Sequence, residues 1–338
     1  MKQQIPLKAE PIWNPITDGL SVSGLELWLI NRVAFELKYL QNLVPVEEWN
    51  KNIGYGQMFQ CCIEGFIKTN TVTGSHKLLE IKTKEFLIKY PANHDDIVYY
   101  ATLAEKQFNI FLELYSKELI KTKFTDSEKY HKVTIELPSG RDISLIGYID
   151  GENDTMIMEN KTRAEWDINA IIEEIDLNLQ YNYYCMIFYA EHDNTLPKSV
   201  WYQHIRRPGG FAYRGPKQKK LESKEEYLYR LTEYISTNKE DHFYRFMSKP
   251  TKDRFYKFLY ICLYPILEAF LDWYEYMIFQ ITPNNSSVTV TPEEEANKYH
   301  WLTPYGLYNP YVQGTEETFR KYALTGSKAG LVKRVKHH

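Results

Sequence analysis

The feature that most constrains the fold is a change of hydrophobic period between Val133 and Thr162. On either side of it apolar residues recur at helical spacing, whereas VTIELPSGRDISLIGYID and TMIMENKT read as β-strands. Pro138-Ser139-Gly140 marks a first turn, and residues 151–154 mark a second. Strands placed between helical regions predict one α/β domain with helical insertions.

The second turn brings two acidic residues together. Its midpoint falls at residues 154–155, so the hairpin sets Asp150 opposite Glu159, with side-chain origins roughly 5 Å apart. Two carboxylates this close repel each other unless a cation lies between them. Hard oxygen ligands suit Mg²⁺ or Mn²⁺, and the backbone carbonyl of Asn160 is a further candidate ligand.

Lys161 lies two residues after Glu159, so both side chains share one face of the strand. An ammonium beside a metal can orient the attacking water and stabilise charge that develops on a phosphate. The alternative is a surface hairpin with an ordinary charge pair. A short acidic pattern of this kind also arises by accident, so the flanking helices decide between the two readings.

Three helical patterns accompany the hairpin. A segment from Ser21 to Tyr39 opens with cap-type serines and continues as an amphipathic helix. A second helix is expected from about residue 55 to 68, and in it Gly56 is followed at four-residue steps by Gln60 and Glu64. Downstream, Gln180 and Tyr184 lie at i and i+4, so they share a helix face.

In this order the patterns resemble the RecB-like branch of the PD-(D/E)XK nuclease superfamily. That branch shows a serine-rich helix, a GxxxHxxxE helix, a GxxD strand, an ExK strand and a QxxxY helix. The matching residues span about 20–207 and are Ser21/Ser23, Gly56-Gln60-Glu64, Gly147-Asp150, Glu159-Lys161 and Gln180-Tyr184. The resemblance implies a restriction-endonuclease-like α/β core, a central mixed β-sheet flanked by helices. We expect a single domain over 1–338, with a helical insertion at about 76–125 and a helical and irregular extension at about 221–338.

The resemblance also implies roles for individual residues. A metal ion would be held by Asp150, Glu159 and Glu64, and Gln180 and Tyr184 would touch DNA near the scissile phosphate. One departure concerns position 60, where many relatives carry a metal-binding histidine and this chain has Gln60. An amide oxygen ligates more weakly or through water, so Gln60 is only a possible ligand.

Some RecB-like nucleases hold an iron–sulfur cluster, but the corresponding segments here contain no cysteine. We therefore expect no iron–sulfur cluster, because such a cluster needs four thiolates. The four cysteines of the chain read as buried free thiols of a reducing compartment. No apolar run of membrane-spanning length is present, so a cytoplasmic location is expected, in a bacterial host cell if the chain is phage-encoded.

A basic and aromatic segment follows the last predicted core strand, SVWYQHIRR. Such a mixture suits single-stranded nucleic acid, whose phosphates and exposed bases both need partners. The net charge is only −3, so a DNA-binding surface has to be local, and a solvated basic loop is the alternative. The candidate DNA contacts are Arg206, Arg207, Arg214, Lys217, Lys219, Lys220 and Tyr213. Amphipathic helices are expected from Ser223 to about Phe279.

These observations predict a Mg²⁺- or Mn²⁺-dependent exonuclease that hydrolyses phosphodiester bonds of single-stranded DNA or of DNA ends. Replication, recombination or repair would be its setting, and phage-encoded family members show a similar IRRP-and-basic-loop arrangement. The alternatives are an endonuclease of the same fold and a non-catalytic DNA-binding accessory subunit. A helicase or recombination partner is suggested only by family analogy.

Overall fold

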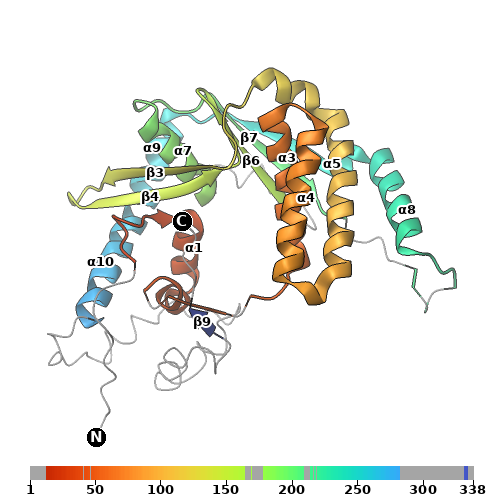
Figure 1. The fold of residues 1–338 in the computed structure, drawn as a ribbon. Coiled ribbons are helices and arrows are strands. Elements are labelled where there is room, and N and C mark those ends of the chain that lie inside the picture. The colour runs from red at the N-terminus through yellow and green to blue at the C-terminus, as the bar shows by residue number, and fades with distance from the viewer. Residues whose placement is uncertain are drawn as a thin grey trace, which may run out of the picture. The chain divides into compact units, whose positions relative to one another are not determined.

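The computed structural model describes residues 13–40, 42–45, 47–163, 169, 178–208, 214–215, 217, 219–281 and 331–333. The chain divides into two compact units, each built from separate segments. One unit comprises residues 1–47, 132–147 and 255–338, and the other comprises residues 48–131 and 148–254. The architecture is α/β, with mixed sheets and flanking helices (Figure 1). The expected single domain over 1–338 remains a prediction.

The second unit contains a four-stranded mixed sheet of order β5-β6-β7-β8. β5 and β6 are antiparallel, β6 and β7 are parallel, and β7 and β8 are antiparallel. The helix α7 (Leu179–Glu191) lies between β6 and β7 in the chain, as a parallel connection requires. The strands are β5 (Gly151–Asn153), β6 (Met156–Arg163), β7 (Ser199–Arg206) and β8 (Phe243–Ser248).

The hairpin turn lies where the sequence predicts it. Gly151 pairs with Met158 and Asn153 pairs with Met156, so the chain reverses at residues 154–155. Asn153 supports this reversal, because its Oδ1 accepts a hydrogen bond of 3.0 Å from the N–H of Thr155. Continued by one residue, this register sets Asp150 opposite Glu159.

Three helices, α3 (Lys51–Thr69), α4 (Val72–Lys89) and α5 (His94–Thr122), stand side by side in this unit (Figure 1). A Cβ at Gly65 would lie 2.6 Å from the carbonyl oxygen of Gly74, which shows how closely α3 and α4 approach. The Thr71 side chain caps the first turn of α4 by accepting a hydrogen bond from the N–H of Gly74. α4 and α5 cover most of the range 76–125, where a helical insertion is expected.

The helix α3 packs against β6 at one point of close approach. A Cβ at Gly56 would lie 2.6 Å from Oγ1 of Thr162, so glycine allows the helix to reach the strand. The buried side chains of α3, including Phe59 and Cys62, join a core that also contains Met158 of β6 and Trp201 of β7. This packing fixes the face of α3 that carries Gln60 and Glu64 relative to the sheet.

The expectation of helices throughout 223–279 is wrong in one part. After α8 (Lys224–Thr237) the chain forms β8, which pairs with β7 at the edge of the sheet. The strand has only six residues and includes a charged Arg245, so its period does not separate it from the neighbouring helices. The helical segments α9 (Lys252–Phe258), η5 (Leu259–Leu263) and α10 (Tyr264–Ile281) follow.

The first unit contains a three-stranded sheet of order β1-β4-β3, in which β1 runs parallel to β4. The turn predicted at 138–140 joins β3 to β4, and both strands contribute residues to each unit. Two more short strands, β2 and β9, pair antiparallel. The bounds are β1 (Leu20–Ser21), β2 (Leu43–Pro45), β3 (Lys129–Glu136), β4 (Asp142–Ile149) and β9 (Leu331–Lys333).

The helix expected over 21–39 begins as predicted and then breaks. Ser21 caps α1 (Val22–Ile30) by accepting a hydrogen bond from the N–H of Gly24. At Asn31 the backbone turns to an extended conformation, and its side chain caps the next helical segment at Ala34. Two short segments complete the region, α2 (Arg32–Phe35) and η1 (Glu36–Leu40).

The four cysteines are free thiols; Cys62 and Cys185 are buried, whereas Cys61 and Cys262 are half-buried. Within the described ranges, none of the helices combines the length and the apolar character needed to cross a bilayer. Residues 164–168 and 170–177, which precede α7 in the chain, lie outside the described part.

Candidate active site

Asp150 occupies the junction between β4 and β5. Its Oδ2 accepts a hydrogen bond of 2.6 Å from the backbone N–H of Asn160. Its own carbonyl oxygen accepts a hydrogen bond of 2.8 Å from the Ser127 hydroxyl. The carboxylate is therefore held against β6, beside the position of Glu159.

Glu159 is a buried acid of the hairpin, with an exposed fraction of 4%. Its Oε1 pairs with Nζ of Lys161 at 2.6 Å and accepts a hydrogen bond of 2.7 Å from Nε2 of Gln180. Its Oε2 is buried and has no hydrogen-bond partner among the described residues. One oxygen of this carboxylate is thus doubly engaged, while the other is left without a donor at considerable desolvation cost.

The helix α7 brings its predicted pair to the same place. Gln180 Nε2 also lies 3.2 Å from the Tyr184 hydroxyl, which confirms that the two side chains share one face. Asn178 caps this helix by accepting a hydrogen bond from the N–H of Tyr181. The cap fixes where α7 begins, and therefore places Gln180 in its first turn, against Glu159.

The electrostatics of the hairpin oppose ionisation. Burial raises the pKa of Asp150 well above its usual range, and the charges of Glu159 and Glu128 raise it further. Burial also raises the pKa of Glu159, an effect that Lys161 opposes. Burial and the charge of Glu159 raise the pKa of Tyr184 as well. Acids that are held together against their own repulsion are characteristic of functional sites.

The remaining predicted metal ligands lie on α3 and β6. Gln60 Oε1 accepts a hydrogen bond of 3.1 Å from the Asn160 side chain, so the amide oxygen expected at the metal is already engaged. Glu64, one helical turn later, pairs with Lys68 at 2.5 Å. Asn160 contributes its N–H to Asp150, and the structure gives no contact that tests its carbonyl as a ligand.

The donor set fits a hard divalent cation in its chemistry. Asp150 and Glu159 offer carboxylate oxygens at opposed positions, and the buried Oε2 of Glu159 has no other partner in the described part. As the side chains stand, no three His, Cys, Asp or Glu residues of the described ranges form a group that could hold a metal ion. The fit therefore rests on the opposed carboxylates and on the unpaired oxygen.

Glu128 is a site residue that the sequence analysis missed. Its carboxyl faces Gln60 and Asp150, and the charge of Glu64 acts on it as well. The backbone of Glu128 has a left-handed φ of 54°. An isolated acid ahead of a strand carries no diagnostic spacing, so only the tertiary structure identifies it.

The neighbouring strand extends the site with residues that no pattern singled out. The β6–β7 register pairs Glu159 with Tyr202, Lys161 with His204 and Arg163 with Arg206. Burial, together with the charges of Arg163 and Lys161, lowers the pKa of His204 to about 4. The predicted Arg206 therefore lies one pleat beyond the row that contains Lys161, next to an exposed Arg163.

Asn160 is held by a buried polar chain that also escaped sequence analysis. Gln203 donates a hydrogen bond of 2.7 Å from Nε2 to Oδ1 of Asn160. Arg245 of β8 donates to Oε1 of Gln203 and lies 4.1 Å from the ring centroid of Tyr115 and 4.3 Å from that of Trp201. β8, which lies in a segment expected to be helical, thus supports Asn160 of β6, the strand that carries Glu159.

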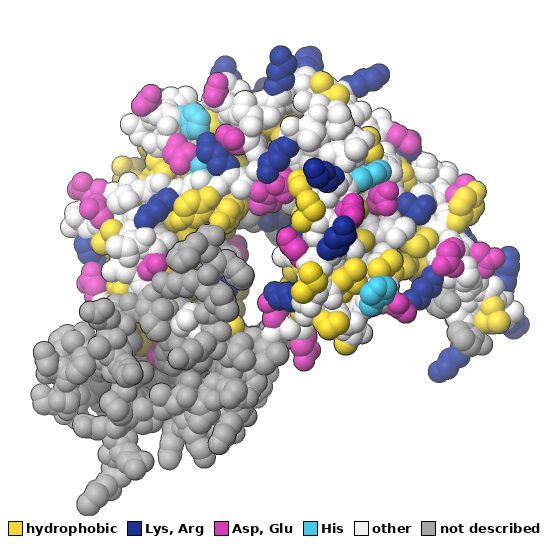
Figure 2. All heavy atoms as spheres, viewed as in Figure 1, with side chains coloured by type: hydrophobic (Ala, Val, Ile, Leu, Met, Phe, Trp, Pro, Cys, Tyr) yellow, Lys and Arg dark blue, Asp and Glu magenta, His cyan; other side chains and the backbone are white. Residues whose placement is uncertain are grey.

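The other predicted DNA-contacting residues lie in separate local environments. The charge of Arg207 acts on the buried Tyr55, and the backbone N–H of Arg214 bonds to Glu222 at 2.9 Å. Tyr213 lies outside the described residues. Lys217, Lys219 and Lys220 are exposed. On the face shown in Figure 2, basic and acidic side chains are interspersed, in keeping with the small net charge.

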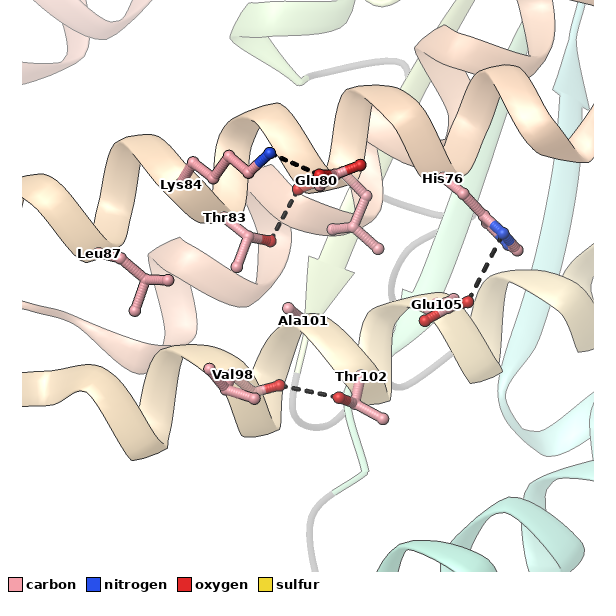
Figure 3. A pocket seen from close by; sticks show the side chains of 10 residues that line it. His76, Glu80, Thr83, Lys84, Leu87, Val98, Ala101, Thr102 and Glu105 are labelled. Carbon is pink, nitrogen blue, oxygen red and sulfur yellow. Dashed lines mark hydrogen bonds and ion pairs between the residues drawn. The ribbon is translucent and has the colours of Figure 1, made fainter.

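A separate groove runs between α4 and α5, with a volume of about 330 Å³ (Figure 3). Its polar side chains pair locally: Lys84 with Glu80 at 2.5 Å, and His76 with Glu105 at 3.6 Å. Leu79, Leu87 and Val98 contribute its apolar lining. The groove contains none of the predicted catalytic residues, so it does not compete with the hairpin as the candidate active site.

Compared with protein-family models and with curated proteins, the chain matches none of them. The geometry and chemistry of its own residues therefore carry the functional interpretation.

Proposed function

We propose that the protein is a Mg²⁺- or Mn²⁺-dependent deoxyribonuclease of the RecB-like PD-(D/E)XK type. The observation that carries this proposal is the environment of Glu159. This buried carboxylate pairs with Lys161 and Gln180 through one oxygen, leaves the other without a partner in the described structure, and stands opposite Asp150. Buried carboxylate oxygens mostly have a partner: Oε2 of Glu152, the other buried acid of the hairpin, also lacks a hydrogen bond but lies 3.2 Å from Nε2 of His131.

The architecture is compatible with a restriction-endonuclease-like core, which this proposal includes. The acids lie on an antiparallel hairpin, and the second strand of that hairpin is followed by a helix and a parallel strand. Contacts at Gly56 and Gln180 place α3 and α7 beside β6, so the acid-bearing strand is flanked by helices.

Each side chain then has a defined task. A bound divalent ion would activate water and neutralise charge on the phosphate, and Asp150 and Glu159 would hold it. Lys161 orients the nucleophile and stabilises charge on the phosphate oxygens, while Gln180 fixes the Glu159 carboxylate. Arg163 and Arg206, which pair one pleat further along, would bind the next phosphates of a DNA strand.

Digestion of end-labelled linear DNA tests the proposal. Single-stranded and duplex substrates are incubated with Mg²⁺, with Mn²⁺ or with EDTA, using the wild-type chain and Asp150→Ala. Degradation is expected with either ion, and not with EDTA or with the variant. Unchanged metal-dependent degradation by Asp150→Ala would show that this mechanism is wrong.

Circular single-stranded DNA separates the two nuclease types, because a strict exonuclease has no end at which to start. We favour the exonuclease, so the circle is expected to survive while the linear strand is degraded. Binding of DNA without cleavage in either ion would instead support an accessory subunit. Gln60 favours that alternative, because its side-chain amide oxygen already accepts a hydrogen bond from the side chain of Asn160.

A further inference from the structure

The segment before β3 is attached to the strand that carries Asp150. The backbone N–H groups of Thr125 and Asp126 both donate to the carbonyl of Glu152, at 2.8 and 3.3 Å, and the Ser127 hydroxyl donates to the carbonyl of Asp150. The next residue, Glu128, follows directly after this anchored segment. Its position beside Asp150 is therefore set by hydrogen bonds at the three preceding residues.

Glu128 also adopts a backbone conformation that few residues with a Cβ accept. Its φ of 54° is left-handed, where Asn and Asp are enriched and glutamate is uncommon. Its carboxyl faces the side chains of Gln60 and Asp150. Asp126, two residues earlier in the same segment, pairs with Lys129 at 3.3 Å instead.

Lys68 acts on Glu128 as an opposite charge, but its own ion-pair partner is Glu64, at 2.5 Å. Glu64 acts on Glu128 as a like charge, and Glu128 in turn acts on Asp150 and Glu159. An independent observation indicates what is missing: Oε2 of Glu159, in a residue with an exposed fraction of 4%, has no partner in the described part of the chain. A cation among these carboxylates would satisfy that oxygen and remove the repulsion.

We propose that Glu128 is a ligand of the divalent cation and supplies the donor that Gln60 fails to supply in place of a histidine. This inference rests on the proposed function, because it concerns the same metal centre. Glu128 lies beside the Gln60 side chain and reaches it from a different element, so a carboxylate at one position can replace an imidazole at the other. The class of ligand is a hard divalent ion, Mg²⁺ or Mn²⁺.

Binding of Mn²⁺ alone to the full chain, without DNA, tests this inference. The electron paramagnetic resonance signal of free Mn²⁺ gives the affinity for the wild type, Glu128→Gln, Glu159→Gln and Asp126→Asn. We expect Glu128→Gln to weaken binding at least tenfold and Glu159→Gln to abolish it. The matched control, Asp126→Asn, removes an acid of the same segment and should change the affinity less than twofold.

A rescue separates ligation from loop shaping. Gln60→His, introduced into Glu128→Gln, should restore the affinity to within threefold of the wild type, because it returns a metal-binding side chain to the same point. Failure of this rescue in a folded double variant overturns the inference in favour of a structural role for Glu128.

The outcomes for the two proposals are distinct. Wild-type binding that Glu159→Gln abolishes and Glu128→Gln leaves unchanged overturns the role of Glu128 and keeps the metal-dependent nuclease. Absence of Mn²⁺ binding by the wild type overturns both. If Glu128→Gln does not fold, Glu128→Asp withdraws the carboxylate by one methylene; an at least threefold loss supports ligation, and unchanged affinity overturns it.

Discussion

Two acids at the start of one hairpin strand have opposite environments. Glu152 lies 2.8 Å from Nζ of Lys129 and 3.2 Å from Nε2 of His131, and although burial alone would raise its pKa, these partners lower it. Asp150, two residues earlier, has its pKa raised by burial and by the acids Glu159 and Glu128. Position in the strand is nearly the same, so the difference comes from the neighbouring side chains.

The contrast separates an acid whose charge is paired, Glu152, from an acid that lies among like charges, Asp150. The cluster around Glu152 satisfies its charges internally, as buried ion pairs must if they are to persist. The cluster around Asp150 gathers like charges, and a folded chain gains no stability from that arrangement. Such a local conflict is expected where function requires it.

The helix α7 connects the two clusters. Its last residue, Glu191, lies 2.7 Å from Nδ1 of His131, while its first turn carries Gln180 against Glu159. His131 is thus bracketed by Glu152 and Glu191. The cluster around Glu152 and His131 therefore anchors the last turn of α7. The first turn of the same helix positions Gln180 against Glu159.

The largest expected effect compares the two lysines, one from each cluster. Lys161→Ala removes the ammonium at Glu159 and should lower the rate of metal-dependent DNA cleavage by about 10³-fold, the scale for losing one preorganised charge-stabilising group. Lys129→Ala removes the corresponding partner of Glu152 and should leave the rate within threefold. Single-turnover cleavage of labelled DNA measures both, and equal losses would erase the distinction between the clusters.

The second effect concerns stability. Glu152→Ala leaves His131 buried with one of its two carboxylates removed, and should lower the free energy of unfolding by about 3 kcal/mol. Urea titration followed by circular dichroism measures the change. A matched substitution, Glu191→Gln, removes the more exposed carboxylate and should cost less. A loss below about 1 kcal/mol for Glu152→Ala would mean that this cluster does not anchor the hairpin.

A smaller effect is the pH dependence of the same cluster. Burial alone would lower the pKa of His131, but hydrogen bonds and charges from Glu152 and Glu191 outweigh it and leave the pKa raised. The folded state therefore binds this proton more tightly than the unfolded state does. The resulting stabilisation is fully present below the unfolded-state pKa and is lost as pH rises through the folded-state pKa.

Unfolding of the wild type and of His131→Gln, measured across that range, checks this expectation. The advantage of the wild type should shrink as the pH rises above the usual histidine pKa of about 6.5. An advantage that grows with pH would show that His131 is neutral in the folded chain.

The features that could be predicted from the sequence are those set by residues close together in the chain. The turn at residues 154–155 and the helix face shared by Gln180 and Tyr184 follow from short-range periodicity, and both are confirmed. β8 was missed because its pairing with β7 joins residues far apart in sequence, and because a buried Arg245 disguises a strand. Its charge is accommodated by an ion pair with Glu118, by the rings of Tyr115 and Trp201 and by Gln203, and none of these contacts leaves a pattern in the sequence.

The same reasoning explains the omission of Glu128. Its proximity to Asp150 arises from hydrogen bonds between segments 23 or more residues apart, such as that from the Ser127 hydroxyl to the Asp150 carbonyl. The opposite holds for Glu64, whose helical spacing from Gln60 was visible but whose partner in the structure is Lys68. Spacing identified the elements of the site, whereas tertiary pairing decided which acids meet.

The smallest expected effect concerns how the charge of Asp150 itself affects stability. Asp150→Asn keeps an oxygen that can accept the N–H of Asn160 but removes the charge facing Glu159, so without metal it should stabilise the chain by up to about 1 kcal/mol. Mn²⁺ at tenfold its Kd should stabilise the wild type by about 1.4 kcal/mol and the variant hardly at all, which reverses their order. Thermal unfolding with EDTA and with Mn²⁺ measures this reversal. A variant that is less stable than the wild type in EDTA would place Asp150 with Glu152 among the structural acids, since its charge would then be stabilising without a cation.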